Sequence, residues 1–156
     1  MFINLVCVGT KMPNWVTNAC DEYTKRLTRD VKLKIIEVEA YRRSKTVSAD
    51  KIKQEEAKKL KLAIPKNNYL IALDVKGKSW STEELSRQME QWQHLGKDVS
   101  LLVGGADGLE PTLLNSCSKV WSLSELTYPH PIVRIVISEQ IYRAWSMLNN
   151  HPYHRE

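Results

Sequence analysis

The sequence predicts an α/β protein in which a mostly parallel β-sheet is flanked by helices. Short apolar runs alternate with longer amphipathic segments along the whole chain of 156 residues, as in proteins built from β-α-β units. Some of these runs are continuously apolar, which is typical of strands covered on both faces. No linker or internal repeat interrupts the alternation, so we expect residues 1–156 to form a single domain.

The first half of the chain contains two strand patterns and two helix patterns. Phe2–Val8 is a short run rich in Val, Ile and Leu, which predicts a strand. A helix is expected from Pro13 to about Thr28, because proline is favoured at a first helical position and apolar residues follow at helical spacing. Strict alternation predicts a second strand from Val31 to about Val38. Ser48 can cap a further helix over Ala49–Ile64.

The second half begins with the most apolar strand pattern of the chain. Tyr69–Leu73 is continuously apolar and is therefore expected to lie centrally in the sheet. Ser81 and Glu84 form a capping box that predicts a helix to Leu95, and Val99–Val103 predicts another buried strand. The pattern then predicts a short helix near Pro111 and a short strand at Lys119–Trp121. A loop at Ser122–Pro131 and a final helix at about Ile132–Leu148 follow.

Composition and cysteine spacing exclude several classes of protein. The shares of 42% hydrophobic and 26% charged residues are those of a folded globular protein. The apolar runs are far shorter than the roughly 20 residues that cross a bilayer, and the start lacks the features of a signal peptide. Cys7, Cys20 and Cys117 lie far apart without a CxxC pair, so neither a disulfide framework nor a metal site is expected. We expect a protein of the reducing cytoplasm, with no membrane and no metal.

The positive charge lies almost entirely in the first half of the chain. Residues 1–78 carry 17 Lys and Arg against 9 Asp and Glu, whereas residues 79–156 carry 6 against 9. The densest stretch, Arg42–Lys66, holds nine basic residues. Such a stretch suits a polyanionic partner, because basic side chains release counterions from phosphates. A solvated helix face is equally compatible with the charge alone.

Three expected strand ends offer places for a ligand, because ligands of open α/β sheets bind beyond the carboxyl ends of the strands. These ends are Leu73-Asp74, Gly104-Gly105 and the segment Ser122–Tyr128. The glycine loop matches neither GxGxxG nor GxxxxGK[ST], so no dinucleotide or P-loop site is predicted. From these residues alone, both a tight turn and a ligand contact stay open for it.

The C-terminal residues His151–Glu156 combine two imidazoles, a phenol and a guanidinium. A frayed tail is the default expectation for a terminus. The same composition can accept a proton, stack on a base and bind a phosphate. His130, which lies between two prolines, is expected to be a rigid-loop residue rather than a catalyst.

Seven short motifs together have the pattern of one enzyme family. They are Val8–Pro13, Leu73-Asp74, Leu101–Gly105, Trp121–Ser124, Pro129-His130-Pro131, Tyr142–Trp145 and His151–Glu156. On these motifs the chain resembles, over essentially its full length, the ribosomal RNA large subunit methyltransferase H family, small SPOUT-class enzymes with a C-terminal trefoil knot. One departure is Ala106-Asp107, where the family usually has Pro-Glu. Since the loss of proline loosens a loop, this departure bears on cofactor affinity.

The resemblance implies transfer of a methyl group from S-adenosylmethionine to N3 of a pseudouridine in a hairpin loop of large-subunit (23S) ribosomal RNA, on the assembled ribosome. It also implies a cytoplasmic homodimer whose site draws on both protomers. The cofactor contacts that it implies are Leu73, Gly104, Leu123, Ser124, Glu125, Leu126, Thr127 and Tyr128. Two other classes stay open: a basic ribosome- or RNA-binding module without catalysis, and a SPOUT methyltransferase that acts on transfer RNA.

The resemblance and the chemistry of the tail give one mechanistic hypothesis. Tyr153, His154 and Arg155 are the expected catalytic or substrate-holding group, and Arg143 and His151 are expected to face the RNA. The pseudouridine imide must lose its N3 proton, which a neutral imidazole, a backbone group or a water can accept. A guanidinium beside it can stabilise the resulting anion.

Overall fold

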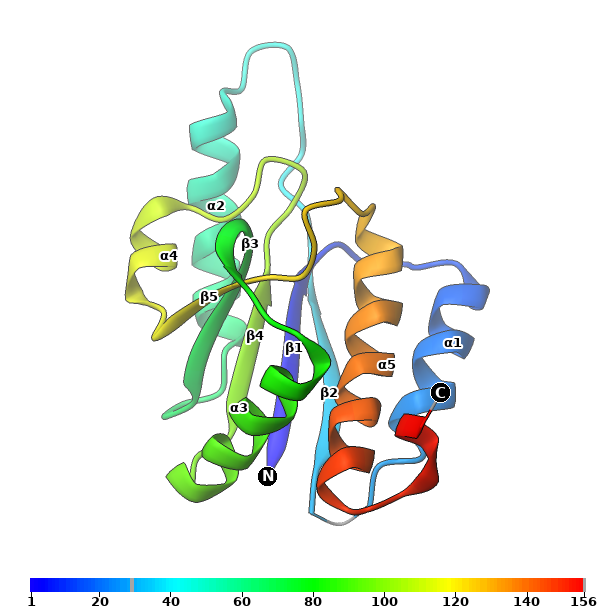
Figure 1. Cartoon of the computed structure of the whole chain (residues 1–156). Coiled ribbons are helices and arrows are strands. Elements are labelled where there is room, and N and C mark those ends of the chain that lie inside the picture. The colour runs from blue at the N-terminus through cyan, green and yellow to red at the C-terminus, as the bar shows by residue number, and fades with distance from the viewer. Residues whose placement is uncertain (29, 156) are drawn as a thin grey trace.

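The computed structural model describes residues 1–28 and 30–155, which contain a five-stranded sheet (Figure 1). Its strands are all paired in parallel and follow the spatial order β2-β1-β4-β3-β5. Their bounds are β1 (Phe2–Val8), β2 (Lys32–Val38), β3 (Tyr69–Ser79), β4 (Val99–Val103) and β5 (Lys119–Ser122). The predicted α/β fold with a parallel sheet is confirmed, and the trefoil knot stays a prediction.

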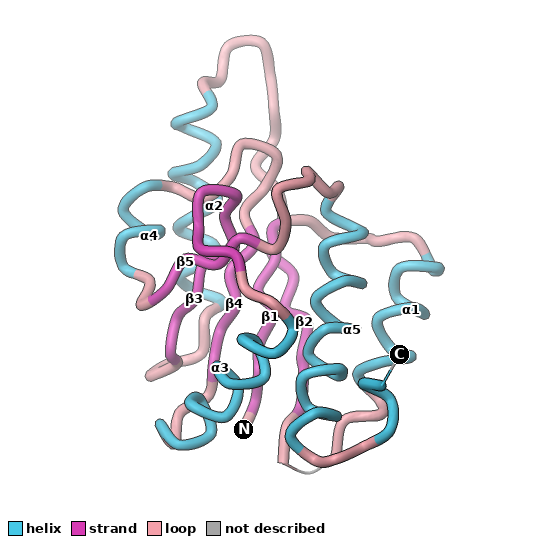
Figure 2. The backbone as a smooth tube through the Cα atoms, viewed as in Figure 1, coloured by secondary structure: helices cyan, strands magenta, loops and turns pink. Residues whose placement is uncertain are grey.

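Helices cover both faces of the sheet and bury two hydrophobic cores. Alternate residues of a strand point to opposite faces, so Ile3 and Leu5 of β1 lie in one core, whereas Val6 and Val8 lie in the other. The first core includes side chains of α3 (Thr82–Leu95) and α5 (His130–Leu148), with α1 (Asn14–Thr24) packed on α5. The second includes side chains of α2 (Ala49–Ala63) and α4 (Pro111–Ser116). Figure 2 shows the course of the backbone through these helices and strands.

Strand β3 is longer than its apolar run predicts. The pattern predicts an end at Leu73, yet both Leu73 and Lys78 pair with Trp121 of β5, and the residues between them bulge outward. Gly77 allows this return, because a Cβ atom there would lie 2.7 Å from the backbone carbonyl carbon of Val120. The extension depends on a neighbouring strand and has no local signature.

The first and last helices also differ from the pattern in their bounds. Helix α5 begins at His130 instead of Ile132, so the prediction that His130 is a loop residue is wrong. Proline is tolerated in a first helical turn because the amide hydrogens there have no partner within the helix, and Pro131 occupies this turn. Pro13 is the residue before α1 rather than its first residue, and this helix ends at Thr24.

The tail adopts regular structure where a frayed end is the default expectation. A 3₁₀ turn over Pro152–Arg155 packs against α5. Within the described ranges, no helix has both the length and the apolar character needed to cross a bilayer.

Candidate functional site

The carboxyl ends of three neighbouring strands lie together. Leu73 of β3 is paired with Val103 of β4 on one side and with Trp121 of β5 on the other. Gly104, the residue after Val103, therefore lies next to Leu73. The segment after Ser122 begins on the other side of the same strand. The structure thus brings together the three strand ends that the sequence marks as ligand positions.

The glycine loop after β4 makes a tight backbone turn. Gly105 and Gly108 form an antiparallel bridge, and Gly108 has a φ of +85°, a conformation that L side chains rarely adopt. A Cβ atom on the buried Gly104 would lie 2.5 Å from the carbonyl carbon of Gly108. Only glycine fits at position 104 without displacing the loop. The loop is thus a tight turn, and a tight turn can also present its backbone groups to a ligand.

The buried carboxylate of Glu56 lies next to this loop. Glu56 of α2 is 4% exposed, and its Oε2 accepts a hydrogen bond from the backbone N–H of Tyr41 at 3.0 Å. Its Oε1 is buried and has no hydrogen-bond partner among the described residues. A Cβ atom on Gly105 would lie only 2.6 Å from this oxygen. Sequence reasoning missed Glu56, because no pattern distinguishes it from the other charged residues of its helix.

His130 and Asp107 connect the loop to two other elements. Burial lowers the pKa of His130, although a hydrogen bond to the backbone of Gly105 acts in the opposite direction. Asp107 forms an ion pair with Arg43, which lies in the basic stretch before α2. The residue pair Ala106-Asp107 therefore retains a carboxylate that binds a basic partner.

The segment after β5 is held by short local hydrogen bonds. Ser122 donates its hydroxyl to the carbonyl of Ser124 at 3.2 Å, and Ser124 Oγ accepts from the backbone N–H of Leu126 at 2.9 Å. Leu126 is a large apolar side chain that is 68% exposed. Glu125 and Thr127 are also exposed, whereas Leu123, Ser124 and Tyr128 are partly buried.

The three strand ends offer both backbone polar groups and apolar side chains to a ligand. The close backbone turn at Gly104 leaves no side chain in the way, and Leu126 offers an uncovered apolar surface. Leu73 is partly buried between them. The resemblance implies cofactor contacts for eight residues. Each of them lies at one of these strand ends or in the segment that follows it.

Arg134 links helix α5 to this end of the sheet through hydrogen bonds. Its guanidinium is 3% exposed and donates from Nη1 to Glu37 Oε2 at 2.5 Å and from Nη2 to the carbonyl of Gly9 at 2.8 Å. The Nε atom is buried without a partner among the described residues. Because Gly9 follows β1 and Glu37 lies near the end of β2, this one side chain fixes the positions of two further strand ends.

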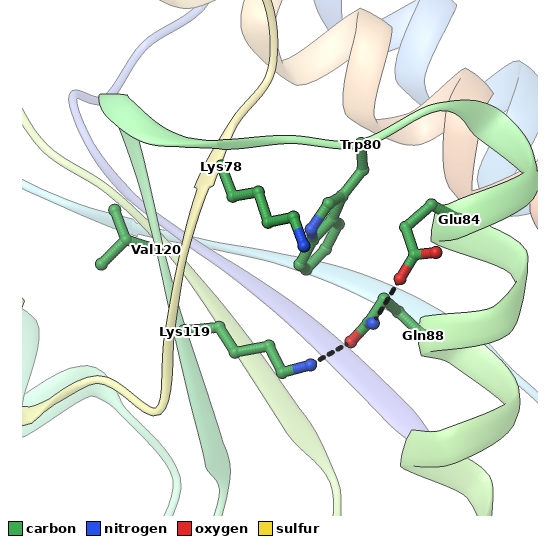
Figure 3. A pocket seen from close by; sticks show the side chains of 6 residues that line it. All are labelled: Lys78, Trp80, Glu84, Gln88, Lys119 and Val120. Carbon is green, nitrogen blue, oxygen red and sulfur yellow. Dashed lines mark hydrogen bonds between the residues drawn. The ribbon is translucent and has the colours of Figure 1, made fainter.

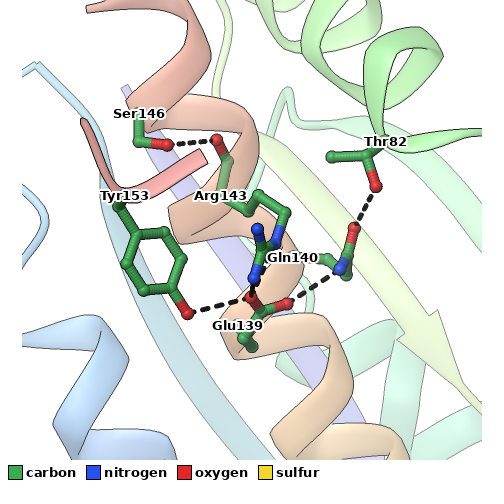
Figure 4. A network of polar contacts seen from close by, with 6 residues as sticks. All are labelled: Thr82, Glu139, Gln140, Arg143, Ser146 and Tyr153. Atoms are coloured by element: carbon green, nitrogen blue, oxygen red, sulfur yellow. Dashed lines mark hydrogen bonds and ion pairs between the residues drawn. The ribbon is translucent and has the colours of Figure 1, made fainter. Parts of the chain in front are cut away.

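Tyr153 of the tail and Arg143 of α5 meet at the carboxylate of Glu139 (Figure 4). The hydroxyl of Tyr153 donates to Oε1 of Glu139 at 2.9 Å, and Nε of Arg143 donates to the same oxygen at 2.8 Å. The guanidinium carbon of Arg143 lies 4.8 Å from the centroid of the Tyr153 ring. Glu139 also accepts a hydrogen bond from Gln140 at 2.8 Å. Sequence reasoning missed Glu139, although its spacing of four residues from Arg143 was a readable signal for an ion pair.

The two histidines of the tail have different surroundings. His151 is exposed, and its backbone N–H donates to the carbonyl of Ser146 at 2.9 Å. His154 is partly buried, and its Nδ1 has no hydrogen-bond partner within the described part of the chain. Arg155 is exposed.

Within one chain, the tail contacts α5 at a point away from the three strand ends. Tyr153 contacts Glu139, which follows His130 by nine residues along α5. A helix rises about 1.5 Å per residue, so these positions are separated by roughly 14 Å along the helix axis. His130 faces the glycine loop, whereas Tyr153 lies beside the middle of α5. The predicted catalytic residues and the predicted cofactor residues therefore form two separate clusters.

Comparison with known families identifies the class of the chain. Residues 1–154 match the family model described as predicted SPOUT methyltransferase. The chain belongs to the SPOUT methyltransferase family. SPOUT methyltransferases in general use S-adenosylmethionine as the methyl donor.

Solved structures of low sequence identity resemble this SPOUT chain to different degrees. One is a probable methylase family protein from Haemophilus influenzae Rd KW20, with a TM-score of 0.58 and 12% identity, over 96% of this chain and 69% of that chain. Another comes from a study of the 2-OH methylation of C/U34 on tRNA, with a TM-score of 0.48 and 13% identity, over 96% of this chain and 97% of that chain. At such identity, the likeness to the Haemophilus protein concerns the fold alone.

Proposed function

We propose that this SPOUT protein transfers a methyl group from S-adenosylmethionine to N3 of a pseudouridine in large-subunit ribosomal RNA, on the assembled ribosome. The observation that carries the proposal is the meeting of Leu73, Gly104 and the 122–128 segment at one end of the sheet. The family match supports the reaction class. The motifs that resemble the ribosomal RNA large subunit methyltransferase H family support the substrate.

The cofactor would be held by the strand ends. Backbone groups of the Gly104 loop and of residues 123–128 would bind its polar parts, and Leu73 and Leu126 would cover its apolar parts. When bound, the cofactor supplies a methyl group on a positively charged sulfur, which is already a strong electrophile. The chain therefore has to position the RNA nitrogen in line with that methyl group, an effect worth up to about 7–11 kcal/mol.

The tail residues would act on the nucleophile. The N3 proton of the pseudouridine passes to the imidazole of His154, or to a backbone group or a water beside it, and the imide anion then attacks the methyl carbon. Support for His154 comes from its Nδ1 atom, which is buried without a partner among the described residues. Arg155 would stabilise the anion, and Tyr153 would fix the tail through Glu139. Arg143 and His151 would contact the RNA near the target.

The separation of the two clusters within one chain supports a homodimer. Since the tail of one chain does not reach its own strand ends, a complete site needs the tail of a second copy beside them. A symmetric dimer would form two such sites, each with the cofactor residues of one protomer and the tail of the other. Such an enzyme would work in the cytoplasm, where ribosomes are found.

Labelled methyl transfer to defined RNA substrates tests the proposal. The purified protein is incubated with labelled S-adenosylmethionine and assembled ribosomes that lack the modification, in parallel with free ribosomal RNA, separate large subunits and transfer RNA. The proposal requires label on a large-subunit pseudouridine, strongest with assembled ribosomes. Label on transfer RNA alone would overturn the substrate. A folded protein that binds RNA without any transfer would overturn the reaction and favour a binding module.

A further inference from the structure

A hollow of about 310 Å³ lies between α3 and the sheet edge formed by β3 and β5 (Figure 3). Its size is at the lower end of the range for small-ligand pockets, roughly 300–1,000 Å³. Six residues line it: Lys78, Trp80, Glu84, Gln88, Lys119 and Val120. None of the six belongs to the strand-end residues or to the tail residues of the proposed methyl-transfer site.

The return of β3 toward β5 assembles this hollow. Lys78 is paired with Trp121, and Lys119 precedes Trp121 by two residues in β5. Residues at a spacing of two lie on the same face of a strand, so the two lysines reach the hollow from neighbouring strands. Trp80 follows Lys78 by two residues and enters from the connection to α3. The close approach at Gly77 keeps these strands together.

The charge inside the hollow is positive. Lys119 donates from Nζ to the amide oxygen of Gln88 at 2.6 Å, and Gln88 in turn donates to Glu84 at 2.7 Å. The carboxylate of Glu84 is balanced by Arg87 at 3.1 Å. Within the described ranges, neither Lys78 nor Lys119 forms an ion pair, so their two ammonium groups have no negative partner there.

The indole of Trp80 supplies a fixed aromatic surface in the same hollow. It stacks on Trp121, with ring centroids 4.8 Å apart and an interplanar angle of 18°. Since Trp121 is buried, this contact holds the Trp80 ring in one orientation. Lys119 Nζ lies over the Trp80 ring, 6.0 Å from its centroid. A rigid aromatic ring beside such ammonium groups is the combination with which proteins bind single-stranded RNA, through base stacking and phosphate contacts.

We propose that this hollow binds one nucleotide of a single-stranded RNA segment, with the base against Trp80 and the phosphate between Lys78 and Lys119. The inference rests on the proposed function in that the RNA is the substrate that is methylated. Lys119 precedes Leu123 by four residues of extended chain, which is about 13 Å. A nucleotide in the hollow would therefore lie roughly 13 Å from the strand ends, and we assign it to the RNA segment that flanks the target base.

Titration with a labelled short oligouridylate tests the site without requiring methyl transfer. We expect Lys78→Ala and Lys119→Ala each to weaken binding about threefold to tenfold. Each should also lower the slope of log affinity against log salt by about 0.7 for every phosphate that is no longer bound. Trp80→Leu should weaken binding about fivefold or more, and Trp80→Phe should restore most of it, because it keeps a ring for stacking. Lys97→Ala removes the same charge from an exposed turn and is the matched control.

Two further probes separate the possible sources of the phosphate. Uridine 5′-monophosphate should bind more weakly than the oligouridylate and should share its dependence on Trp80. Equal binding of inorganic phosphate to wild type and Trp80→Leu, with no preference for the nucleotides, would overturn the nucleotide assignment. Oligouridylate binding that is unchanged in the lysine variants would overturn the site.

Binding of S-adenosylmethionine, measured on the same variants, should stay at the wild-type value. It reports on the strand ends separately, so failure of the proposed methyl transfer and failure of this site give different results. A variant that retains cofactor binding but loses oligouridylate binding supports the site even if no methyl transfer is found.

Discussion

The hydroxyl of Tyr153 donates a hydrogen bond to the carboxylate of Glu139, 2.9 Å away and 14 residues earlier in the chain. The same carboxylate oxygen accepts from Arg143, whose guanidinium lies against the Tyr153 ring. One acidic side chain thus holds a tyrosine and an arginine that the sequence marks only as separate candidates. The tail is fixed to α5 before any RNA or second copy binds.

Removing the Tyr153 hydroxyl should release the tail. A hydrogen bond of this kind contributes about 1 kcal/mol, so Tyr153→Phe should make the amide hydrogens of residues 151–155 exchange about fivefold faster. Tyr41→Phe, in the loop before α2, is the control and should leave the tail unchanged. Unaltered exchange in Tyr153→Phe would show that the packing of the aromatic rings alone holds the tail.

The same hydrogen bond gives the tail a defined dependence on pH. Burial, and then the hydrogen bond to Glu139, raise the pKa of Tyr153 above its ordinary value near 10. The unfolded chain therefore loses this proton at a lower pH than the folded chain, and the stability that the proton supports falls as the pH rises above about 10. Absorbance of tyrosinate should show one tyrosine that ionises later than the others, and Tyr153→Phe should remove it.

Loss of the His154 imidazole should slow methyl transfer more than it weakens cofactor binding. General-base catalysis contributes typically about 10²–10⁴-fold, so His154→Ala should lower kcat by about a hundredfold or more. Cofactor affinity, measured by calorimetry, should change little because the strand ends lie in a separate cluster. His151→Ala is the matched control for the removal of an imidazole, and its effect should fall mainly on KM for RNA. Unchanged turnover in His154→Ala would exclude His154 from the mechanism.

A side chain at position 104 should abolish cofactor binding while the sheet still forms. The added methyl group of Gly104→Ala would contact the backbone of Gly108 at 2.5 Å, so the loop must move. We expect the Kd for S-adenosylmethionine to rise at least about tenfold, as measured by calorimetry. Gly96→Asn is the control, because an added Cβ at Gly96 has no neighbouring atom within 4 Å and asparagine tolerates the positive φ of this position. Wild-type affinity in Gly104→Ala would place the cofactor elsewhere.

Reversing the charge of helix α2 should weaken ribosome binding in a salt-dependent manner. Lys58 and Lys61 are exposed, and Lys59 donates to the backbone carbonyl of Glu39 at 3.3 Å. The triple change to glutamate should lower affinity at least about tenfold at low salt and reduce the dependence of log affinity on log salt. Lys97→Glu serves as the control. If neither the affinity nor the slope changes, the basic stretch is only a solvated face.

Acid should destabilise the end of the molecule at which His130 lies. Burial lowers the pKa of His130 below its ordinary value near 6.5. The unfolded chain therefore binds this proton first as the pH falls, and the stability that neutral His130 provides is complete above about pH 6.5 and is lost below it. Urea unfolding between pH 8 and 5 should show a smaller loss in His130→Gln than in wild type. His94→Gln, at an exposed position of α3, should behave like wild type.

Elements with a local signature were predicted well from the sequence. Ser81 caps α3 as expected, because the backbone N–H of Glu84 donates to Ser81 Oγ at 3.1 Å. The second half of the expected capping box differs, since the Glu84 carboxylate accepts from Arg87 and Gln88 instead of reaching back to Ser81. Ser48 likewise caps α2, by accepting from the backbone N–H of Lys51 at 3.1 Å. Both capping hydrogen bonds join residues that are three positions apart, so the sequence alone indicates them.

Features that depend on distant partners could not be predicted in this way. The second half of β3 exists because Lys78 meets Trp121, and the tail is ordered because Tyr153 meets Glu139. The sequence indicated the three strand ends one by one but not that they lie together. The order of strands in a sheet cannot be predicted from the periodicity of each strand. The separation of the tail from these loops likewise depends on the point at which Tyr153 meets α5, nine residues after His130.

The position of β1 inside the sheet, between β2 and β4, determines when the chain can fold during its synthesis. Ile3 is paired with Val99, so one edge of the first strand to be made waits for 96 further residues before its partner exists. At a synthesis rate of about 5–20 residues per second, this wait lasts about 5–20 seconds. During that time a nascent chain on the ribosome exposes an unpaired, largely apolar strand edge. Early chaperone binding should therefore fall on residues 2–8, and it should end when β4 emerges from the exit tunnel.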